Sequence, residues 1–338
     1  MIQTKSGNEI SRLGIGTYLG HLNDTTDRQI TTIIETAMLA KMNHVDTAPN
    51  YRAQRSERAI GAALHSTKIA REDIFISSKV GFVPFEWDVP INDGAYFKNR
   101  FIDSAIFTVE ELIGGTQCFS PKYINWQINE SLNRLSTTYL DLVYLHNFEN
   151  IVTKVSTKNL ERIFRSALTN LRKFNEQGKI RFIGMASWSG FLMNEANALH
   201  LEQLLLWAEQ EDCSKIFRVI QAPFNLGFPN LLVNKSQNIH GLAMSLIRAA
   251  QTLNLSLITS APLMHGQLAE MELPKALKDK WPTFSAAQVC IALAMSTPCI
   301  LSTLVGIKSE AHLNDFFEVE ALDQLTANEF IALLKSHP

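Results

Sequence analysis

The feature that most limits how this chain can fold is a regular alternation of short apolar runs with longer segments of helical periodicity. Eight short runs are rich in β-branched, aliphatic or aromatic residues and predict buried strands. Most of them lack strict polar alternation, which is typical of strands covered on both faces. They span Leu13–Gly16, His44–Thr47, Ile74–Lys79, Leu140–Leu145, Ile180–Ala186, Phe217–Gln221, Leu255–Ser260 and Cys299–Leu304.

The longer segments have the spacing and the end signals of helices. In one of them Ser120 precedes Pro121, and Ile124 and Ile128 repeat at helical spacing. Gly178 follows another segment at the position where glycine commonly ends a helix. The predicted helices span Thr26–Met42, Ser56–His65, Pro121–Leu135, Leu160–Gln177, Met193–Glu211, Ile239–Leu253, Ser285–Met295 and Glu310–Phe317.

This alternation predicts a parallel sheet, because consecutive parallel strands need a crossover connection. Eight repeats favour a closed barrel over an open doubly wound sheet. We therefore expect an α/β protein in which residues 1–338 form a single (β/α)8 TIM-barrel domain. Residues 80–120 form a long connection after the third strand, and their aromatic content favours an ordered active-site loop. Residues 319–338 form a C-terminal tail.

The composition argues against several classes of function. A hydrophobic fraction of 46% lets the chain bury a large core. A net charge of −2 lacks the basic excess of nucleic-acid-binding proteins, so we expect no nucleic-acid partner. The cysteines are scattered, the first residues lack the apolar stretch of a secretory signal, and no run of about 18 apolar residues occurs. We therefore expect a cytoplasmic protein with no membrane partner, while its oligomeric state stays unknown.

Polar side chains suited to proton chemistry fall at the ends of predicted strands. Asp46 lies near the end of the second strand, Lys79 closes the third, and His146 follows the fourth. Tyr51 lies in the loop after the second strand. The carboxyl ends of the strands form the active-site face of such a barrel, so these side chains are expected to meet. Each residue alone also fits a structural role, but the combination at three strand ends indicates a catalytic cluster.

Within this cluster Tyr51 is the candidate general acid. Free tyrosine has a pKa of about 10, and the ammonium group of Lys79 would lower that pKa. Tyr51 could then donate a proton to a carbonyl oxygen while hydride reaches the carbon, and accept the proton in the reverse direction. A general acid typically contributes about 10²–10⁴ in rate. Asp46 would hold Lys79 in place, and His146 would orient the carbonyl oxygen.

The same residues lie in motifs that resemble those of the aldo-keto reductase family. The segment VDTAPNYRAQRSERAIGAAL (Val45–Leu64) is similar to the family signature, in which Asp-Thr-Ala precedes a tyrosine, a glutamate and a glycine. SSKVG carries Lys79 and DLVYLHN carries His146, in the matching order and spacing. The similarity extends over nearly the whole chain, from LGIGTY (Leu13–Tyr18) to LVGIKSEAHL (Leu304–Leu313).

The resemblance implies an oxidoreductase that interconverts an alcohol with an aldehyde or ketone, including sugars, and uses NADP(H) in preference to NAD(H). The cofactor lies over the barrel mouth without a Rossmann domain, and LGIGTY is indeed not a GxGxxG fingerprint. By the same resemblance, Gln221 holds the carboxamide, Phe224 stacks on the nicotinamide, and Lys308 is the one clear cation for a 2′-phosphate. The implied cofactor-binding residues are Gly16, Thr17, Tyr18, Ser187, Gln221, Phe224, Pro262, Leu263, Gly266, Leu268, Gly306, Lys308 and His312.

The chain departs from the family pattern at several positions. The family usually has Gly-Val-Ser-Asn after the fifth strand, whereas this chain has GMASW at residues 184–188. Ala186 cannot supply a hydroxyl group to the carboxamide, so Ser187 and Gln221 would carry that task. Arg52 follows the tyrosine where glycine is usual, and Phe316 replaces a common adenine-contacting asparagine.

The substrate pocket is the least constrained part of the site. Phe82, Trp87, Phe119 and Asn147 are the candidate lining residues for a small-molecule substrate. Two alternatives stay open at this point. A regulatory protein of the same fold would bind the cofactor without turnover, as the potassium-channel β subunits of the family do. A metal-dependent hydrolase is disfavoured because no HxH pair follows an early strand, so no metal is expected.

Overall fold

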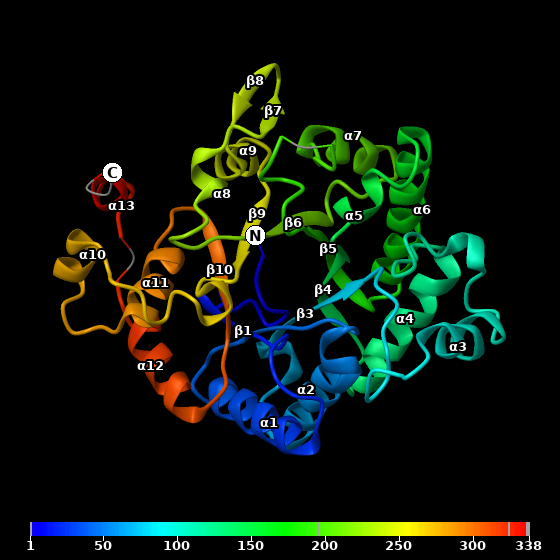
Figure 1. The fold of residues 1–338 in the computed structure, drawn as a ribbon, viewed down its shortest axis with the longest axis horizontal. Helices are drawn as coiled ribbons and strands as arrows, with labels where there is room; N and C mark the ends of the chain where they lie inside the picture. The colour runs from blue at the N-terminus through cyan, green and yellow to red at the C-terminus, as the bar shows by residue number, and fades with distance from the viewer. Residues whose placement is uncertain (1, 195, 324, 336–338) are drawn as a thin grey trace.

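The eight predicted strands close into a parallel barrel in the computed structural model, which describes all residues except 1, 195, 324 and 336–338 (Figure 1). Around the barrel their order is β1-β10-β9-β6-β5-β4-β3-β2. Their bounds lie within two residues of the predicted ones, which confirms the expected fold class. They are β1 (Leu13–Gly16), β2 (His44–Asp46), β3 (Phe75–Val80), β4 (Leu140–His146), β5 (Ile180–Ala186), β6 (Phe217–Pro223), β9 (Ser256–Ser260) and β10 (Ile300–Gly306).

Helices surround the barrel, as the coiled ribbons of Figure 1 show. Those that match predicted segments are α1 (Asp24–Leu39), α2 (Arg55–Ser66), α4 (Pro121–Arg134), α6 (Thr157–Glu176), α7 (Leu201–Gln210), α9 (Leu246–Thr252), α11 (Ala286–Met295) and α12 (Glu310–Glu320). Shorter or additional ones are α3 (Asp93–Phe97), α5 (Glu149–Val152), α8 (Asn230–Val233), α10 (Lys275–Lys280) and α13 (Ala327–Lys335). Within the described residues no helix is both long and apolar enough to cross a membrane.

Two predicted helices begin later than expected. The segment from Ile239 instead completes a small antiparallel hairpin of β7 (Gln237–Ile239) and β8 (Leu242–Met244), and α9 starts only at Leu246. Gly241, with a φ of 81°, forms part of the turn between the two strands. Helix α7 starts at Leu201 because the chain before it is held by other bonds. The side-chain amide of Gln237, for example, donates to the carbonyl oxygens of Phe191 and Leu199.

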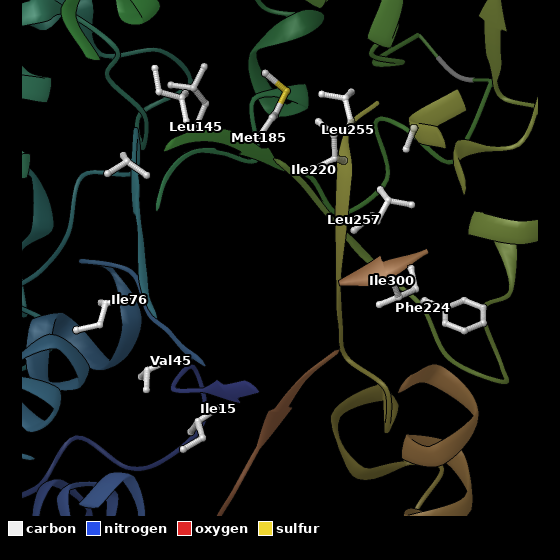
Figure 2. Close-up of a cluster of buried hydrophobic side chains, with 14 of the residues drawn as sticks. Ile15, Val45, Ile76, Leu145, Met185, Ile220, Phe224, Leu255, Leu257 and Ile300 are labelled. Carbon is white, nitrogen blue, oxygen red and sulfur yellow. The ribbon is translucent and has the colours of Figure 1, made fainter. Parts of the chain in front are cut away.

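The strands place alternate side chains on the two faces of the barrel wall. In β3, Phe75 packs in the apolar cluster inside the barrel, and Ile76 packs in the larger cluster between strands and helices. Figure 2 shows Val45, Ile76 and Leu145 as members of this outer cluster. The strand-end groups Asp46 and Lys79 share the buried inner region, because their side chains follow the same alternation as Phe75.

Glu57 and Gly61 of the segment Val45–Leu64 have structural roles on helix α2. The buried carboxylate of Glu57 accepts hydrogen bonds from Ser78 Oγ at 2.8 Å and Arg134 Nε at 2.7 Å. A Cβ atom on Gly61 would lie 2.3 Å from the backbone oxygen of Arg134. Glycine therefore lets α2 and the end of α4 approach closely beside the strand that carries Lys79.

The long connection after β3 is ordered by its own apolar cluster. Helix α3 and a π-helical turn at Lys98–Ile102 bring Phe101 against the rings of Phe107 and Trp126, with centroid distances of 5.3 and 5.2 Å. The connection is also tied to the loop after β2, because Trp87 N donates to Ala53 O at 3.0 Å. This satellite cluster explains why a loop of such length has a defined path.

Candidate active site

Asp46 and Lys79 form a buried ion pair at the carboxyl ends of two adjacent strands. β2 and β3 are paired in register, with Asp46 opposite Ser77. Lys79 Nζ donates to Asp46 Oδ1 at 2.5 Å and to the backbone oxygen of Thr47 at 2.8 Å. The other carboxylate oxygen, Oδ2, accepts from Ser77 Oγ at 2.7 Å and Gln221 Nε2 at 3.0 Å. The charges are thus paired and bonded, as buried charges must be.

Tyr51 lies directly against this pair, in a turn between β2 and α2. Lys79 Nζ is 4.6 Å from the centroid of the Tyr51 ring. The rings of Tyr18 and His146 approach the Tyr51 ring edge-on, with centroid distances of 5.2 and 5.9 Å. Phe82 in turn contacts the His146 ring at 4.9 Å. The structure therefore brings together the four residues that the sequence predicts as the catalytic cluster.

Burial and the neighbouring charges set the protonation states of the cluster. Burial raises the pKa of Tyr51, and the lowering effect of Lys79 is present but smaller, so the net direction is upward. The expectation of a lowered phenol pKa is therefore wrong for this structure, because burial outweighs the ammonium group. The phenol is protonated at neutral pH, which is the form that can donate a proton.

Lys79 and His146 carry opposite protonation states. Burial acts to lower the pKa of Lys79, but Asp46 and Tyr51 together raise that pKa above its usual value. Burial, reinforced by the charge of Lys79, holds the pKa of His146 well below its usual value. The site therefore combines a permanent ammonium group with a neutral imidazole, which can donate one hydrogen bond without adding charge.

A cavity of about 690 Å³ opens above this cluster and extends to α12. Most of the predicted site residues line this cavity, between the carboxyl ends of the barrel strands and helix α12. These are Gly16, Tyr18, Asp46, Tyr51, Phe82, His146, Asn147, Ser187, Gln221, Pro262, Leu263, Gly266, Gly306, Lys308 and His312. A volume of this size is in the range of small-molecule and cofactor sites.

Several predicted site residues do not line the cavity. Lys79 lies behind Asp46 and Tyr51, and the Thr17 hydroxyl donates to the Asp46 backbone oxygen at 3.0 Å. Phe224 is buried in the apolar cluster of Figure 2, and Leu268 is buried near Gly227.

Two of the four candidate pocket residues also lie elsewhere. The ring of Trp87 stacks on the guanidinium groups of Arg55 and Arg58, 5.0 and 4.4 Å from the respective carbon atoms. Phe119 is buried against Phe148, with a centroid distance of 5.1 Å. Both side chains fix loops around the cavity, and a contact with substrate stays a prediction for them.

The cavity wall also contains residues that were not singled out from the sequence. Trp188 and His265, from loops after β5 and β9, stack with a centroid distance of 5.7 Å and an angle of 21°. Asn50 precedes Tyr51, and Asp315 lies near His312 on α12. The helical spacing of His312 and Asp315 could have indicated that they share a face. The stack across two loops has no local signal in the sequence.

The altered loop after β5 is supported by a buried carboxylate. Glu149 Oε1 accepts from the backbone nitrogen of Trp188 at 2.6 Å, and Ser187 Oγ accepts from Gly190 N at 2.9 Å. Burial raises the pKa of Glu149, against the opposing effect of the Trp188 hydrogen bond. These contacts hold Ser187 at the cavity wall despite the loss of the usual serine at Ala186.

Comparison with known proteins agrees with the motifs. A sequence profile described as the Aldo/keto reductase family matches residues 12–337. An NADH-specific methylglyoxal reductase from Escherichia coli is 28% identical to this chain over 64% of its residues, and the match covers 56% of that protein. The chain spans about half the length of two other curated relatives that it matches. A D-threo-aldose 1-dehydrogenase from Pseudomonas is 24% identical, with 94% of this chain and 92% of that protein covered.

The fold is shared with solved structures of low sequence identity. An aldo/keto reductase from Klebsiella pneumoniae, solved with NADP and acetate, superposes with a TM-score of 0.65 at 15% identity. The superposition covers all of this chain and 95% of that one. At 15% sequence identity, this similarity shows that the two chains share a fold.

Proposed function

The chain belongs to the aldo/keto reductase family, and from this premise we propose that it is an oxidoreductase that interconverts a carbonyl compound and an alcohol with NADP(H) or NAD(H). The observation that carries the proposal is the placement of Tyr51. Its protonated phenol lies beside the Lys79 ammonium group and the neutral imidazole of His146, at one end of an extended cavity.

The residues of the cavity fit a nicotinamide dinucleotide. The end near Tyr51 offers the Gln221 amide and the Ser187 hydroxyl, groups that can bond a carboxamide. Toward α12 the wall offers Lys308, the only lysine or arginine among the described lining residues, as a partner for phosphate. Lys308 supports NADP(H) as the preferred cofactor, and the relatives named for NADH and NADP support both variants.

Tyr51, Lys79, Asp46 and His146 would each have a separate role in the proton transfer. The bound cofactor supplies or accepts the hydride. Tyr51 donates its phenol proton to the carbonyl oxygen, and the Lys79 ammonium group stabilises the phenolate that remains. Asp46 keeps Lys79 charged and in place. His146, held neutral by burial, donates a hydrogen bond to the carbonyl oxygen and orients it.

The lining near Tyr51 favours an uncharged substrate. Phe82 and Trp188 supply aromatic surface there, and Asn50 and Asn147 supply amide groups. No lysine or arginine among the described residues lines this end, so a substrate carboxylate or phosphate would find no permanently charged partner there. We infer a neutral aldehyde, ketone or sugar, in line with the relatives named for methylglyoxal and for an aldose.

The test is a cofactor-oxidation assay combined with fluorescence titration by NADPH and NADH. We expect saturable binding of at least NADPH, and turnover with one or more of methylglyoxal, aldoses and aromatic aldehydes. Carboxylated analogues of the same aldehydes are expected to be poorer substrates. Tight cofactor binding without turnover on any carbonyl would instead favour a regulatory protein, and absence of both would refute the proposal.

A further inference from the structure

The backbone directly after Tyr51 has an unusual conformation. Arg52, Ala53 and Gln54 have φ values of 48°, 50° and 71°, three consecutive residues in the left-handed region. Glycine adopts this region freely, whereas a side chain with a Cβ atom is strained there. Consecutive strained residues persist only where the surroundings hold them. The chain therefore needs specific contacts to keep this turn next to the candidate general acid.

Arg52 supplies the first of these contacts. Its side chain is 1% exposed, and its guanidinium group donates to the backbone oxygen of His21 from Nε at 3.1 Å and Nη2 at 2.7 Å. Nη2 also donates to Asp27 Oδ1 at 2.5 Å. A charged donor bonded to a carboxylate is among the stronger contacts a protein can form, and here the Asp27 side chain is partly buried. Arg52 thus joins the Tyr51 turn to the loop after β1 and to helix α1.

The next residues extend the contacts to the loop after β3. Gln54 Nε2 donates to Phe85 O at 2.9 Å, and Ala53 O accepts from Trp87 N. Arg55 binds the second oxygen of Asp27 at 2.5 Å and donates from Nε to Trp87 O at 2.8 Å. Each strained residue therefore has its own partner, and Asp27 is shared between the two arginines.

The same contacts act on groups that touch Tyr51. Arg52 holds the carbonyl group of His21, which follows closely after Tyr18 in the chain. The Tyr18 ring lies edge-on to the Tyr51 ring, although Tyr18 itself is 56% exposed. Backbone bonds fix the start of this turn, since Tyr51 N donates to Ala48 O at 3.0 Å and Lys79 Nζ donates to Thr47 O at 2.8 Å. A shift of the part after Tyr51 would still change the distance between the Tyr51 phenol and the Lys79 ammonium group.

We propose that Arg52, through its ion pair with Asp27, is a positioning residue that fixes the Tyr51 phenol against Lys79. The inference rests on the proposed function, since it assigns a task in the same proton transfer. Arg52 itself does not line the cavity and is not assigned any contact with substrate or cofactor.

The decisive variant is Arg52→Gly. Glycine accepts the left-handed backbone, so this substitution removes the ion pair without adding strain. We expect kcat to fall by about 10-fold to 100-fold, the effect of a small displacement of a reacting group, with an unchanged dissociation constant for NADPH. Arg52→Lys should restore part of kcat, because one ammonium group can bind Asp27 but cannot also span to the His21 oxygen. Asp27→Asn removes the charge pairs of both Arg52 and Arg55 at nearly constant size and should lower kcat as well.

The matched control is Asp24→Asn. Asp24 is exposed and contacts only Arg55 of this group, at 3.1 Å, so its neutralisation should leave kcat and cofactor affinity at the wild-type level. A second readout uses the Tyr51 phenol itself, titrated by NMR in protein carrying labelled tyrosine. Lys79 lowers the pKa of this phenol, whereas burial, Asp46 and Tyr18 raise it. Displacement from Lys79 in Arg52→Gly should therefore move the titration to higher pH.

Two outcomes count against the proposal. Wild-type kcat and wild-type phenol titration in Arg52→Gly and Asp27→Asn would overturn the proposal. Parallel losses of kcat, cofactor affinity and thermal stability would also overturn it, because they indicate a general structural role. If Arg52→Gly does not fold, Asp27→Asn decides by the same criteria. If the wild-type chain turns over no carbonyl, the proposed function fails, and the phenol titration alone decides on Arg52.

Discussion

The charge of Lys79 acts on both Asp46 and Tyr51 in the candidate active site. Its ammonium group is 1% exposed, pairs with Asp46, and lies over the Tyr51 ring. Lys79 lowers the pKa of the Tyr51 phenol and is the cation that pairs with Asp46. A substitution of Lys79 therefore affects both Tyr51 and Asp46. Removal of one member of a buried ion pair usually costs about 3–5 kcal/mol of stability.

Lys79→Met is therefore expected to lower kcat by at least about 100-fold and to destabilise the fold by several kcal/mol. Steady-state kinetics and urea unfolding measure the two effects. The control is Lys98→Met, which removes an exposed lysine paired only with Asp103 and should change neither quantity. A Lys79→Met enzyme with normal kcat would rule out the assigned role of the ammonium group.

At this scale the sequence predicted which residues meet but not their protonation states. Asp46, Lys79 and His146 could be placed together because each lies at the end of a parallel strand. The net pKa direction of Tyr51 could not be predicted, because it depends on how completely loops distant in sequence bury the phenol. The stack of Trp188 on His265 could not be predicted either, because it joins two loops that are distant in sequence.

At the scale of elements, the packing of α2 against α4 depends on one glycine. Alanine in a helix interior is normally more stable than glycine by roughly 0.5–1 kcal/mol. At Gly61 the added methyl group would lie 2.3 Å from a backbone oxygen, a clash that no side-chain motion relieves. The steric effect should therefore exceed the gain in helix propensity.

We expect Gly61→Ala to lower the free energy of unfolding by about 3 kcal/mol or more, measured by urea denaturation. The control is Gly178→Ala, where φ is +71° but no atom lies within 4 Å of the new Cβ. That variant should lose only about 1 kcal/mol, the cost of the left-handed conformation. Equal losses in the two variants would contradict the close approach of α2 and α4.

The elements themselves were largely predictable, and the exceptions have local causes. Every barrel strand was expected within two residues, because buried strands and amphipathic helices have distinct periods. The hairpin of β7 and β8 could not be predicted from periodicity, because its residues continue the apolar pattern of a helix; the local signal for it is Gly241 at the turn. The internal helices of the loop after β3 depend on its satellite cluster rather than on periodicity.

At the scale of the whole molecule, a buried histidine makes stability depend on pH. His44 lies inside the barrel, with Nδ1 2.9 Å from Ser302 Oγ. Burial lowers the pKa of His44 to about 4, against an ordinary value of 6.5. Between these values the unfolded chain binds a proton that the folded chain does not, so stability is lost as the pH falls from about 6.5 to about 4.

The contribution of His44 to this loss is about 3 kcal/mol at most. It can be isolated by comparing the urea unfolding of wild type and His44→Gln at pH 7 and pH 4.5. We expect a smaller loss on acidification in the variant, while His146, Glu149 and Glu320 contribute equally to both proteins. Identical pH dependence in the two proteins would show that His44 does not resist protonation in the fold.

The most direct test of the whole account is the kcat of Tyr51→Phe on the best carbonyl substrate, measured together with the dissociation constant of NADPH. Phenylalanine keeps the ring contacts with Tyr18 and His146 but has no proton to give. We expect kcat to fall by at least about 100-fold while the cofactor still binds with wild-type affinity. A variant that reduces the carbonyl at nearly the wild-type rate would contradict the assignment of Tyr51 as the general acid.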